Sequence, residues 1–123
     1  MKIGEVAGQA GVTVDTVRFY ERIGVLPSPA RTASGYRDYE PATVERIQFT
    51  RELQAIGFTL GEAVDALAAH DAGEATCESE RWRLQAVLDR VDAKLAELTA
   101  LRARITEVQD ACASGHCMLV AGP

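Results

Sequence analysis

The feature that most constrains this chain is a seven-residue repeat of apolar side chains between Cys77 and Cys112. Four apolar residues recur at intervals of seven, and two more follow the first two after four residues. Together they form one seam: Leu84, Leu88, Val91, Leu95, Leu98 and Ile105. A seam this narrow is typical of a coiled coil rather than of a helix lying on a broad core. The repeat therefore predicts a long helix that packs against another helix.

Two cysteines occupy the same seam, because Cys77 precedes Leu84 by seven residues and Cys112 follows Ile105 by seven. A straight helix rises about 1.5 Å per residue, so their sulfurs would lie roughly 50 Å apart in one chain. An antiparallel pair that places 84 near 105 of the partner also places 77 near 112. This register predicts a homodimer with a cross-chain thiol cluster at each end of its helix pair. The alternative is two small buried residues that close the seam.

A third cysteine follows in the sequence CASGHC at 112–117. Gly115 predicts a helix stop, since glycine can take the left-handed conformation that reverses the chain. Cys117 would then fold back beside Cys112, and a thiol of the partner would complete three soft ligands. Such ligands suit zinc, cadmium, lead or mercury, whereas calcium and magnesium prefer oxygen. His116 would add an imidazole and favour zinc, or it is a solvated loop histidine.

Length and composition bound the function. A chain of 123 residues with so long a helix has little room for a large enzyme core. No apolar run is long enough to span a bilayer, and no signal peptide follows Met1, so we expect a cytoplasmic protein. Three cysteines fit metal binding or reactive thiols better than a disulfide framework. The net charge is −5, but residues 1–58 hold seven basic and seven acidic side chains, which leaves room for a basic face there.

The N-terminal segment has the pattern of two short helices joined by a tight turn. Apolar residues at helical spacing predict a first helix that ends at Gly11: Ile3, Val6, Ala7 and Ala10. Thr13 is placed to cap a second helix that runs to Arg22. This is the helix-turn-helix plan, in which the second helix enters the major groove of DNA.

Residues 24–39 interrupt the helical pattern with Gly24, Pro27 and Pro29. Polar and aromatic residues flank a central Ala-Ser-Gly, which predicts a small β-hairpin, or wing. Its side chains Arg31, Tyr36 and Arg37 are candidates for contacts with DNA phosphates. The alternative is a solvated hairpin whose tyrosines pack on the helices.

Two further helices precede the long one. Pro41 begins a third helix that stops at Gly57, and the capping-box spacing of Thr59 and Glu62 begins a fourth. Thr76 then caps the long helix and leaves Cys77 in its first turn. The expected fold is mainly α: a winged helix-turn-helix DNA-binding domain at 1–70, a linker at 71–75, an antiparallel coiled-coil dimerisation helix at 76–112, and a short C-terminal metal-binding loop with a tail at 113–123.

This order of elements resembles the MerR family of bacterial transcriptional regulators. Four segments carry the resemblance: TVRFYE at 16–21, GVL at 24–26, GYRDY at 35–39 and LQAIGFTL at 53–60. The resemblance implies a dimer on a two-fold symmetric operator within an over-long promoter spacer. Members of the family typically repress without inducer, and with inducer they distort the DNA so that RNA polymerase meets aligned promoter elements.

The resemblance also assigns residues. Thr16, Arg18 and Tyr20 match the groove-facing helix, while Tyr36 and Arg37 match the wing's phosphate contacts. In the metal-sensing branch the ligands are a cysteine that begins the dimerisation helix and two in the C-terminal loop of the other protomer, which match Cys77, Cys112 and Cys117. Cysteine at 77 resembles sensors of divalent ions rather than those of copper(I), silver or gold. Three cysteines disfavour the redox branch, whose iron–sulfur cluster uses four.

The expected function is therefore a homodimeric regulator that binds a palindromic operator and activates transcription by DNA distortion when Hg, Zn, Cd or Pb binds Cys77, Cys112 and Cys117. Its partners would be promoter DNA and, indirectly, RNA polymerase, with no membrane and no enzymatic activity. The alternative within the family is a response to thiol stress or an organic inducer. A thiol enzyme using Cys112 or Cys117 with His116 lacks any sign of an orienting acid, and a storage or structural coiled coil leaves the helix-turn-helix and wing unexplained.

Overall fold

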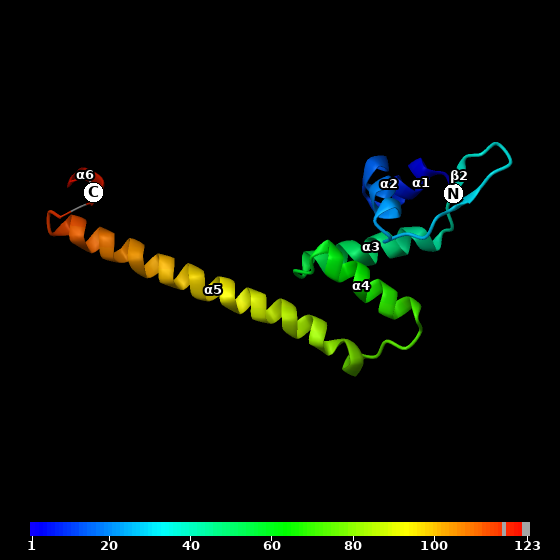
Figure 1. Ribbon diagram of the computed structural model, residues 1–123. Helices are drawn as coiled ribbons and strands as arrows, with labels where there is room; N and C mark the ends of the chain where they lie inside the picture. The colour runs from blue at the N-terminus through cyan, green and yellow to red at the C-terminus, as the bar shows by residue number, and fades with distance from the viewer. Residues whose placement is uncertain (117, 122–123) are drawn as a thin grey trace. The chain divides into compact units, whose positions relative to one another are not determined.

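The computed structural model describes residues 1–116 and 118–121, and this part of the chain holds six helices and one short hairpin (Figure 1). It divides into two compact units, Met1–Arg83 and Leu84–Pro123, each treated by itself. The mainly helical fold predicted from the sequence is confirmed. In order, the elements are α1 (Ile3–Ala10), α2 (Val14–Arg22), β1 (Ala30–Arg31), β2 (Arg37–Asp38), α3 (Ala42–Ala55), α4 (Leu60–Asp71), α5 (Cys77–Ala113) and α6 (Met118–Ala121).

The helix-turn-helix forms where local sequence signals place it. Gly11 ends α1 in the left-handed conformation, with φ of 72°. The Thr13 hydroxyl oxygen then accepts a hydrogen bond of 3.1 Å from the backbone N–H of Thr16 and so caps α2. Both signals were predicted, and together they fix the short turn between the two helices.

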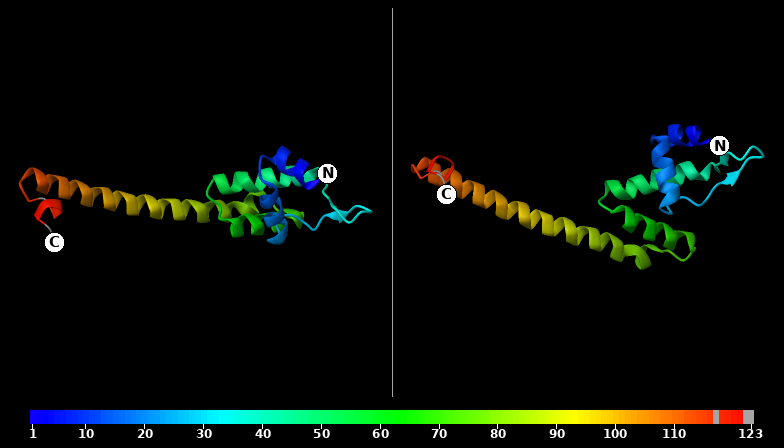
Figure 2. Two further views of the ribbon diagram at one scale, coloured as in Figure 1. Left: turned by 90° about the horizontal axis from the view of Figure 1, so that it is seen from above. Right: turned by 45° about the horizontal axis from the view of Figure 1, so that its top comes forward.

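The hairpin is also present, although its strands are only two residues long. Ala30 pairs with Asp38 and Arg31 pairs with Arg37 in antiparallel register. Gly35 has φ of 85°, a conformation that glycine takes without steric cost and that lets the chain turn. In both views of Figure 2 the hairpin extends beyond the helices of its own unit.

A single apolar core joins these elements, with α3 packed against α1 and α4, and α1 packed against α2. The core residues come from four helices, the segment between α2 and β1, and the residue that follows β2: Val6, Ala7, Ala10, Val17, Tyr20, Val25, Leu26, Tyr39, Val44, Ile47 and Leu67. Polar contacts at its edge come from Arg46 of α3. Its Nε donates to the Val25 carbonyl, and its two terminal nitrogens each lie 2.8 Å from an oxygen of Asp71, the last residue of α4.

We expect Asp71→Asn to lower the free energy of unfolding by about 0.5 to 1 kcal/mol at neutral pH. The ion pair of Arg46 with Asp71 is bidentate, which strengthens it, but the Asp71 side chain is half exposed, so solvent weakens it. The hydrogen bond from Arg46 is the main cause that lowers the pKa of the Asp71 carboxyl. A lowered pKa stabilises the fold above the unfolded-state value, and this contribution is lost as the pH falls. Urea unfolding should therefore show the variant and wild type converging in acid. Glu74→Gln, in the exposed linker, is the control; equal stability of Asp71→Asn at neutral pH would contradict the prediction.

Side-chain caps also define the later helices. Thr59 and Glu62 form the predicted capping box of α4. The Thr76 hydroxyl oxygen accepts a hydrogen bond from the N–H of Ser79 at 3.0 Å, which begins α5 at Cys77. The predicted linker begins one residue early, because Asp71 still belongs to α4.

The end of α5 follows the predicted stop. Gly115 has φ of 84°, its N–H donates to the Cys112 carbonyl, and the next N–H, of His116, donates to the Ala111 carbonyl at 2.8 Å. Beyond this cap the sequence predicted a loop and tail, but Met118–Ala121 forms the short helix α6. Methionine, leucine and alanine are strong helix formers, which favours a helical turn at these residues.

The apolar seam of α5 is exposed along its whole length in the single chain. Its six predicted residues, from Leu84 to Ile105, are 45 to 56% exposed. Leu101, which lies outside the predicted repeat, is 55% exposed as well. An exposed apolar surface of this extent on one helix is typical of a surface that packs against another protein chain. Among the described residues, no helix combines the length and the apolar character needed to cross a membrane.

Candidate nucleic-acid interface and metal ligands

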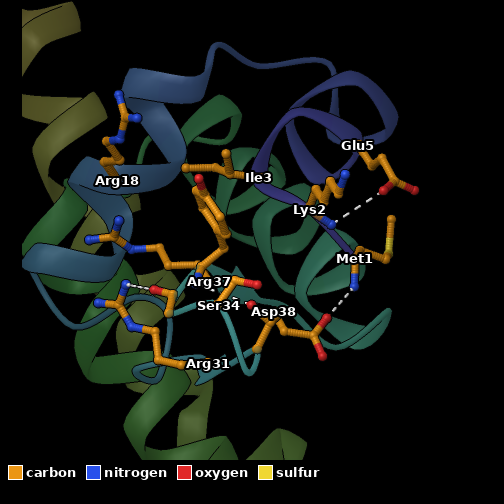
Figure 3. Close-up of a pocket in the computed structure, with 12 residues that line it drawn as sticks. Met1, Lys2, Ile3, Glu5, Arg18, Arg31, Ser34, Arg37 and Asp38 are labelled. Carbon is orange, nitrogen blue, oxygen red and sulfur yellow. Dashed lines mark hydrogen bonds and ion pairs between the residues drawn. The ribbon is translucent and has the colours of Figure 1, made fainter.

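The N-terminal residues, α2 and the hairpin enclose a surface hollow of about 860 Å³ (Figure 3). We call it the basic hollow, because the charged side chains that line it are four basic ones and two acidic ones: Lys2, Arg18, Arg31, Arg37, Glu5 and Asp38. This local excess of positive charge contrasts with the net charge of −5 for the whole chain. A hollow of this charge suits a polyanion such as a nucleic-acid backbone.

Three arginines from different segments contribute to the hollow. Arg18 stands on the exposed side of α2, where its Nη1 lies 3.3 Å from an oxygen of Asp15. Arg31 in β1 donates from Nη1 to the carbonyl of Gly35 at 3.2 Å. In Figure 3 the guanidinium groups of Arg18, Arg31 and Arg37 project to the same side. The planar guanidinium fork matches phosphate oxygens, so this arrangement suits binding to a DNA backbone.

Arg37 is held by an acidic residue of α2. Its Nε lies 3.1 and 3.4 Å from the two carboxylate oxygens of Glu21, and the Tyr39 hydroxyl donates to the same carboxylate at 2.9 Å. Glu21 is 15% exposed and Arg37 is 35% exposed. The carboxylate therefore joins the wing to α2, and no sequence signal had singled it out. Only the TVRFYE segment contained it, without a role.

The hydrogen bond between Tyr39 and Glu21 should make the stability of the protein depend on pH in the alkaline range. Burial, followed by the hydrogen bond and charge of Glu21, raises the pKa of Tyr39 from 10.0 to about 12. A raised pKa means that the stabilisation is complete below pH 10.0 and is lost as the pH rises toward 12. Between these values we expect wild type to lose roughly 2 kcal/mol more unfolding free energy than Tyr39→Phe. Urea unfolding at stepped alkaline pH measures the difference; parallel curves for the two proteins would contradict it.

Tyr20 does not lie where the resemblance placed it. Its ring is only 6% exposed, and its hydroxyl donates to Oε1 of Gln54 in α3 at 3.1 Å. Tyr20 follows Val17 by three residues, so both occupy the buried face of α2. The expectation that Tyr20 faces the groove is thus wrong in this structure. Phe19 is the more exposed ring, at 37%, and the Arg22 guanidinium lies 5.4 Å from its centroid.

The other predicted DNA-binding residues are accessible to differing extents. Thr16 is half-buried in the first turn of α2, where its hydroxyl lies 2.8 Å from that of Thr13. Tyr36 at the tip of the hairpin is 74% exposed. The hollow thus brings together Arg18, Arg31, Tyr36 and Arg37 of the predicted set. It also adds Lys2, which sequence reasoning missed because a single lysine near a chain end forms no pattern.

The predicted metal ligands lie at the ends of α5 or beyond it. Cys77 is an exposed free thiol in the first turn, and Cys112 is half-buried in the last. His116 is exposed just after the helix stop, and Cys117 lies outside the described residues. Within residues 1–116 and 118–121, no three side chains of His, Cys, Asp or Glu converge on a metal position.

Comparison with known proteins gives a consistent family. Residues 1–70 match the family described as MerR HTH family regulatory protein, and residues 44–108 match the one described as MerR, DNA binding. The mercuric resistance operon regulatory protein of Bacillus cereus is 34% identical, covering 90% of this chain and 84% of that protein. The regulator ZntR of Escherichia coli K12 is 33% identical, covering 90% and 79%.

A solved structure is similar as well. The transcription regulator PbrR691 from Ralstonia metallidurans CH34, in complex with lead(II), superposes with a TM-score of 0.82 at 34% identity. The match covers 90% of this chain and 87% of that one. The matched family, the similar proteins and the similar solved structure are all described as regulators, and none of them is an enzyme. The chain belongs to the MerR family of helix-turn-helix transcriptional regulators.

Proposed function

We propose that this protein is a cytoplasmic homodimer that senses a soft divalent metal ion and regulates a promoter. It would bind a palindromic operator in an over-long promoter spacer and activate transcription by DNA distortion when Hg, Zn, Cd or Pb binds. RNA polymerase would be engaged indirectly, through the shared promoter. The observation that carries this proposal is that Cys77 and Cys112 share heptad positions with an apolar seam that the single chain leaves exposed.

The DNA-binding part of the proposal is supported by the helix-turn-helix and the basic hollow. Placed in a major groove, α2 presents Arg18 and the half-buried Thr16 toward base edges. The wing then brings Arg31, Tyr36 and Arg37 toward the neighbouring phosphates. Tyr20 is omitted from this set because it packs in the core. Arg18 belongs to both surfaces, so it is the residue whose loss should weaken binding most.

The metal-binding part rests on the positions of the thiols. Cys77 and Cys112 occupy the first and last turns of one helix, so a site that uses both needs a second chain in antiparallel register. Cys117, five residues after Cys112 and past the helix stop, would supply the third thiolate. His116 would be a further ligand if the ion is zinc. The names of the similar proteins, mercuric resistance regulator and a lead(II) complex, support a soft metal as inducer.

The coupling between sites follows from the chain's connectivity. A soft ion would favour an arrangement that brings three thiolates together. Cys77 opens α5 directly after the linker from α4, and α4 is fastened to α3 through Asp71 and Arg46. A shift of the first turn of α5 would therefore be passed to α4 and α3, and α3 packs against α1 of the DNA-binding part. The ion biases the DNA-bound state only as far as its affinities for the two arrangements differ.

Two measurements on the purified protein test this function. Duplexes selected from a random pool should include palindromic sequences whose binding falls steeply with salt. Titration of the free protein with Hg, Pb, Cd and Zn should produce thiolate-to-metal absorbance that saturates. Failure to select any duplex would overturn the regulator, and failure to bind any of the four ions would overturn the metal sensor alone.

A second candidate function is a response to thiol-reactive compounds. The exposed free thiol of Cys77 favours it, because an accessible cysteine at a helix N-terminus is open to modification. In that case alkylating or oxidising agents, and none of the metals, would change transcription from the selected operator.

A further inference from the structure

Glu21 occupies an unusual place for an acidic residue in a DNA-binding surface. It lies on α2, the helix proposed to enter the groove, where a negative charge should repel phosphates. Yet its carboxylate is largely buried, at 15% exposure, and receives hydrogen bonds from Arg37 and Tyr39 of the wing. The charge is thus neutralised in place, and the side chain links two elements that would bind DNA together.

The geometry of the Arg37 pair leaves part of the guanidinium available. Arg37 meets Glu21 through Nε, at 3.1 and 3.4 Å, and within the described residues its two terminal nitrogens donate no hydrogen bond. Arg37 remains 35% exposed and lines the basic hollow beside Arg18 and Arg31. One edge of the fork is therefore fixed by the carboxylate while the other faces the hollow. Fixing a flexible side chain before binding lowers the entropy cost of using it.

We propose that Glu21 is a positioning residue for DNA binding, which holds the Arg37 guanidinium so that its terminal nitrogens meet a phosphate. Glu21 itself touches no DNA in this arrangement and acts through Arg37. The inference rests on the DNA binding proposed above. Wild-type binding to the selected duplex therefore has to be established first, and a failure there is separate from a failure of this inference.

The decisive feature of the test is the sign of the effect. Charge alone predicts that Glu21→Gln tightens operator binding, because a negative charge leaves the surface. Positioning predicts the opposite, a loss of about tenfold in affinity, since a charge-assisted hydrogen bond to phosphate is weakened in each protomer. The slope of log affinity against log salt should also shrink by about 0.9 for each phosphate that Arg37 no longer neutralises.

Asp15→Asn is the matched control. Asp15 lies on the same helix and also pairs with an arginine, Arg18, but its side chain is 93% exposed. Removing this charge should leave affinity equal or raised. Opposite signs for Glu21→Gln and Asp15→Asn would support the proposal. Tighter binding by both variants would overturn it, because charge would then explain the whole effect.

A double-mutant cycle separates positioning from a general loosening of the wing. In an Arg37→Ala background, Glu21→Gln should have no further effect on affinity or salt slope. Tyr39→Phe removes the other bond to Glu21 and should stay within about twofold of wild type. If Glu21→Gln acts equally with and without Arg37, or if Tyr39→Phe matches it, the role is structural and the proposal fails.

A further variant covers the case in which Glu21→Gln does not fold. Arg37→Lys keeps the positive charge but has no planar fork that reaches the carboxylate and a phosphate together. It should lose about tenfold in affinity, as expected for Glu21→Gln, because the charge remains but is no longer held in place. Retention of wild-type affinity by Arg37→Lys would show that only the charge matters and would overturn the proposal.

Discussion

Replacement of Cys77 by serine is expected to abolish metal-induced transcription while operator binding stays close to that of wild type. The thiolate would be one of three soft ligands. Losing a residue that only orients a metal ligand weakens metal affinity by up to about 100-fold, so losing a ligand itself should weaken it by more than that. The residue begins α5 and does not line the basic hollow, so the proposed DNA contacts should be unaffected. A reporter assay with and without Hg or Pb, together with a gel shift, measures both quantities. Glu78→Gln, one residue further along α5, is the control.

A mixed dimer tests whether the site crosses between chains. Cys77→Ser keeps Cys112 and Cys117, whereas a Cys112→Ser/Cys117→Ser chain keeps only Cys77. Neither homodimer should bind metal well. A heterodimer of the two should regain one complete site if the ligands come from different chains, and none if they come from the same chain. Absorbance on titration distinguishes the outcomes, and an unchanged transcriptional response in Cys77→Ser alone would refute the assignment.

Much of the fold could be predicted because its boundaries are set locally. The caps at Thr13, Thr59 and Thr76 and the stops at Gly11 and Gly115 each depend on a few neighbouring residues. Such signals survive in any context, since they satisfy backbone groups that a helix end leaves unpaired. The long helix α5 could be predicted in the same way, because a heptad repeat is visible in the local sequence and does not depend on the rest of the chain.

Contacts between distant segments were harder to predict. Glu21 meets Arg37 across 16 residues, and Arg46 meets Asp71 across 25, without any spacing rule that links them. Tyr20 was misplaced for a related reason. The resemblance supplied a role for the residue, but in the fold the side of α2 that carries Tyr20 is buried in the core, and its hydroxyl donates to Gln54 of α3. The basic hollow likewise depends on folding, because it gathers charges from the N-terminus, α2 and the hairpin.

The second large prediction concerns the seam: Val91→Lys should turn the proposed dimer into monomers. Val91 is 45% exposed in the single chain, and in the antiparallel register it would be buried near position 98 of the partner. Losing the burial of one apolar side chain costs about 1.5 to 3 kcal/mol, and the change occurs twice per dimer. The dissociation constant should rise by about 100-fold to 10,000-fold. Sedimentation over a range of protein concentrations measures it. Operator binding should weaken with it, because two half-sites need two linked chains.

Charge complementation then tests the direction and register of the pair. Leu98→Glu alone should also be monomeric, but mixed with Val91→Lys it should form a heterodimer, since the lysine of one chain would face the glutamate of the other. The remaining pair, Val91 with Leu98, keeps its native side chains. A parallel pair would instead place 91 opposite 91, so the mixture would gain no such pairing. Lys94→Glu, whose side chain is 72% exposed off the seam, should remain dimeric. A mixture no more dimeric than its components would refute the antiparallel register, and with it a metal site built from both ends of α5.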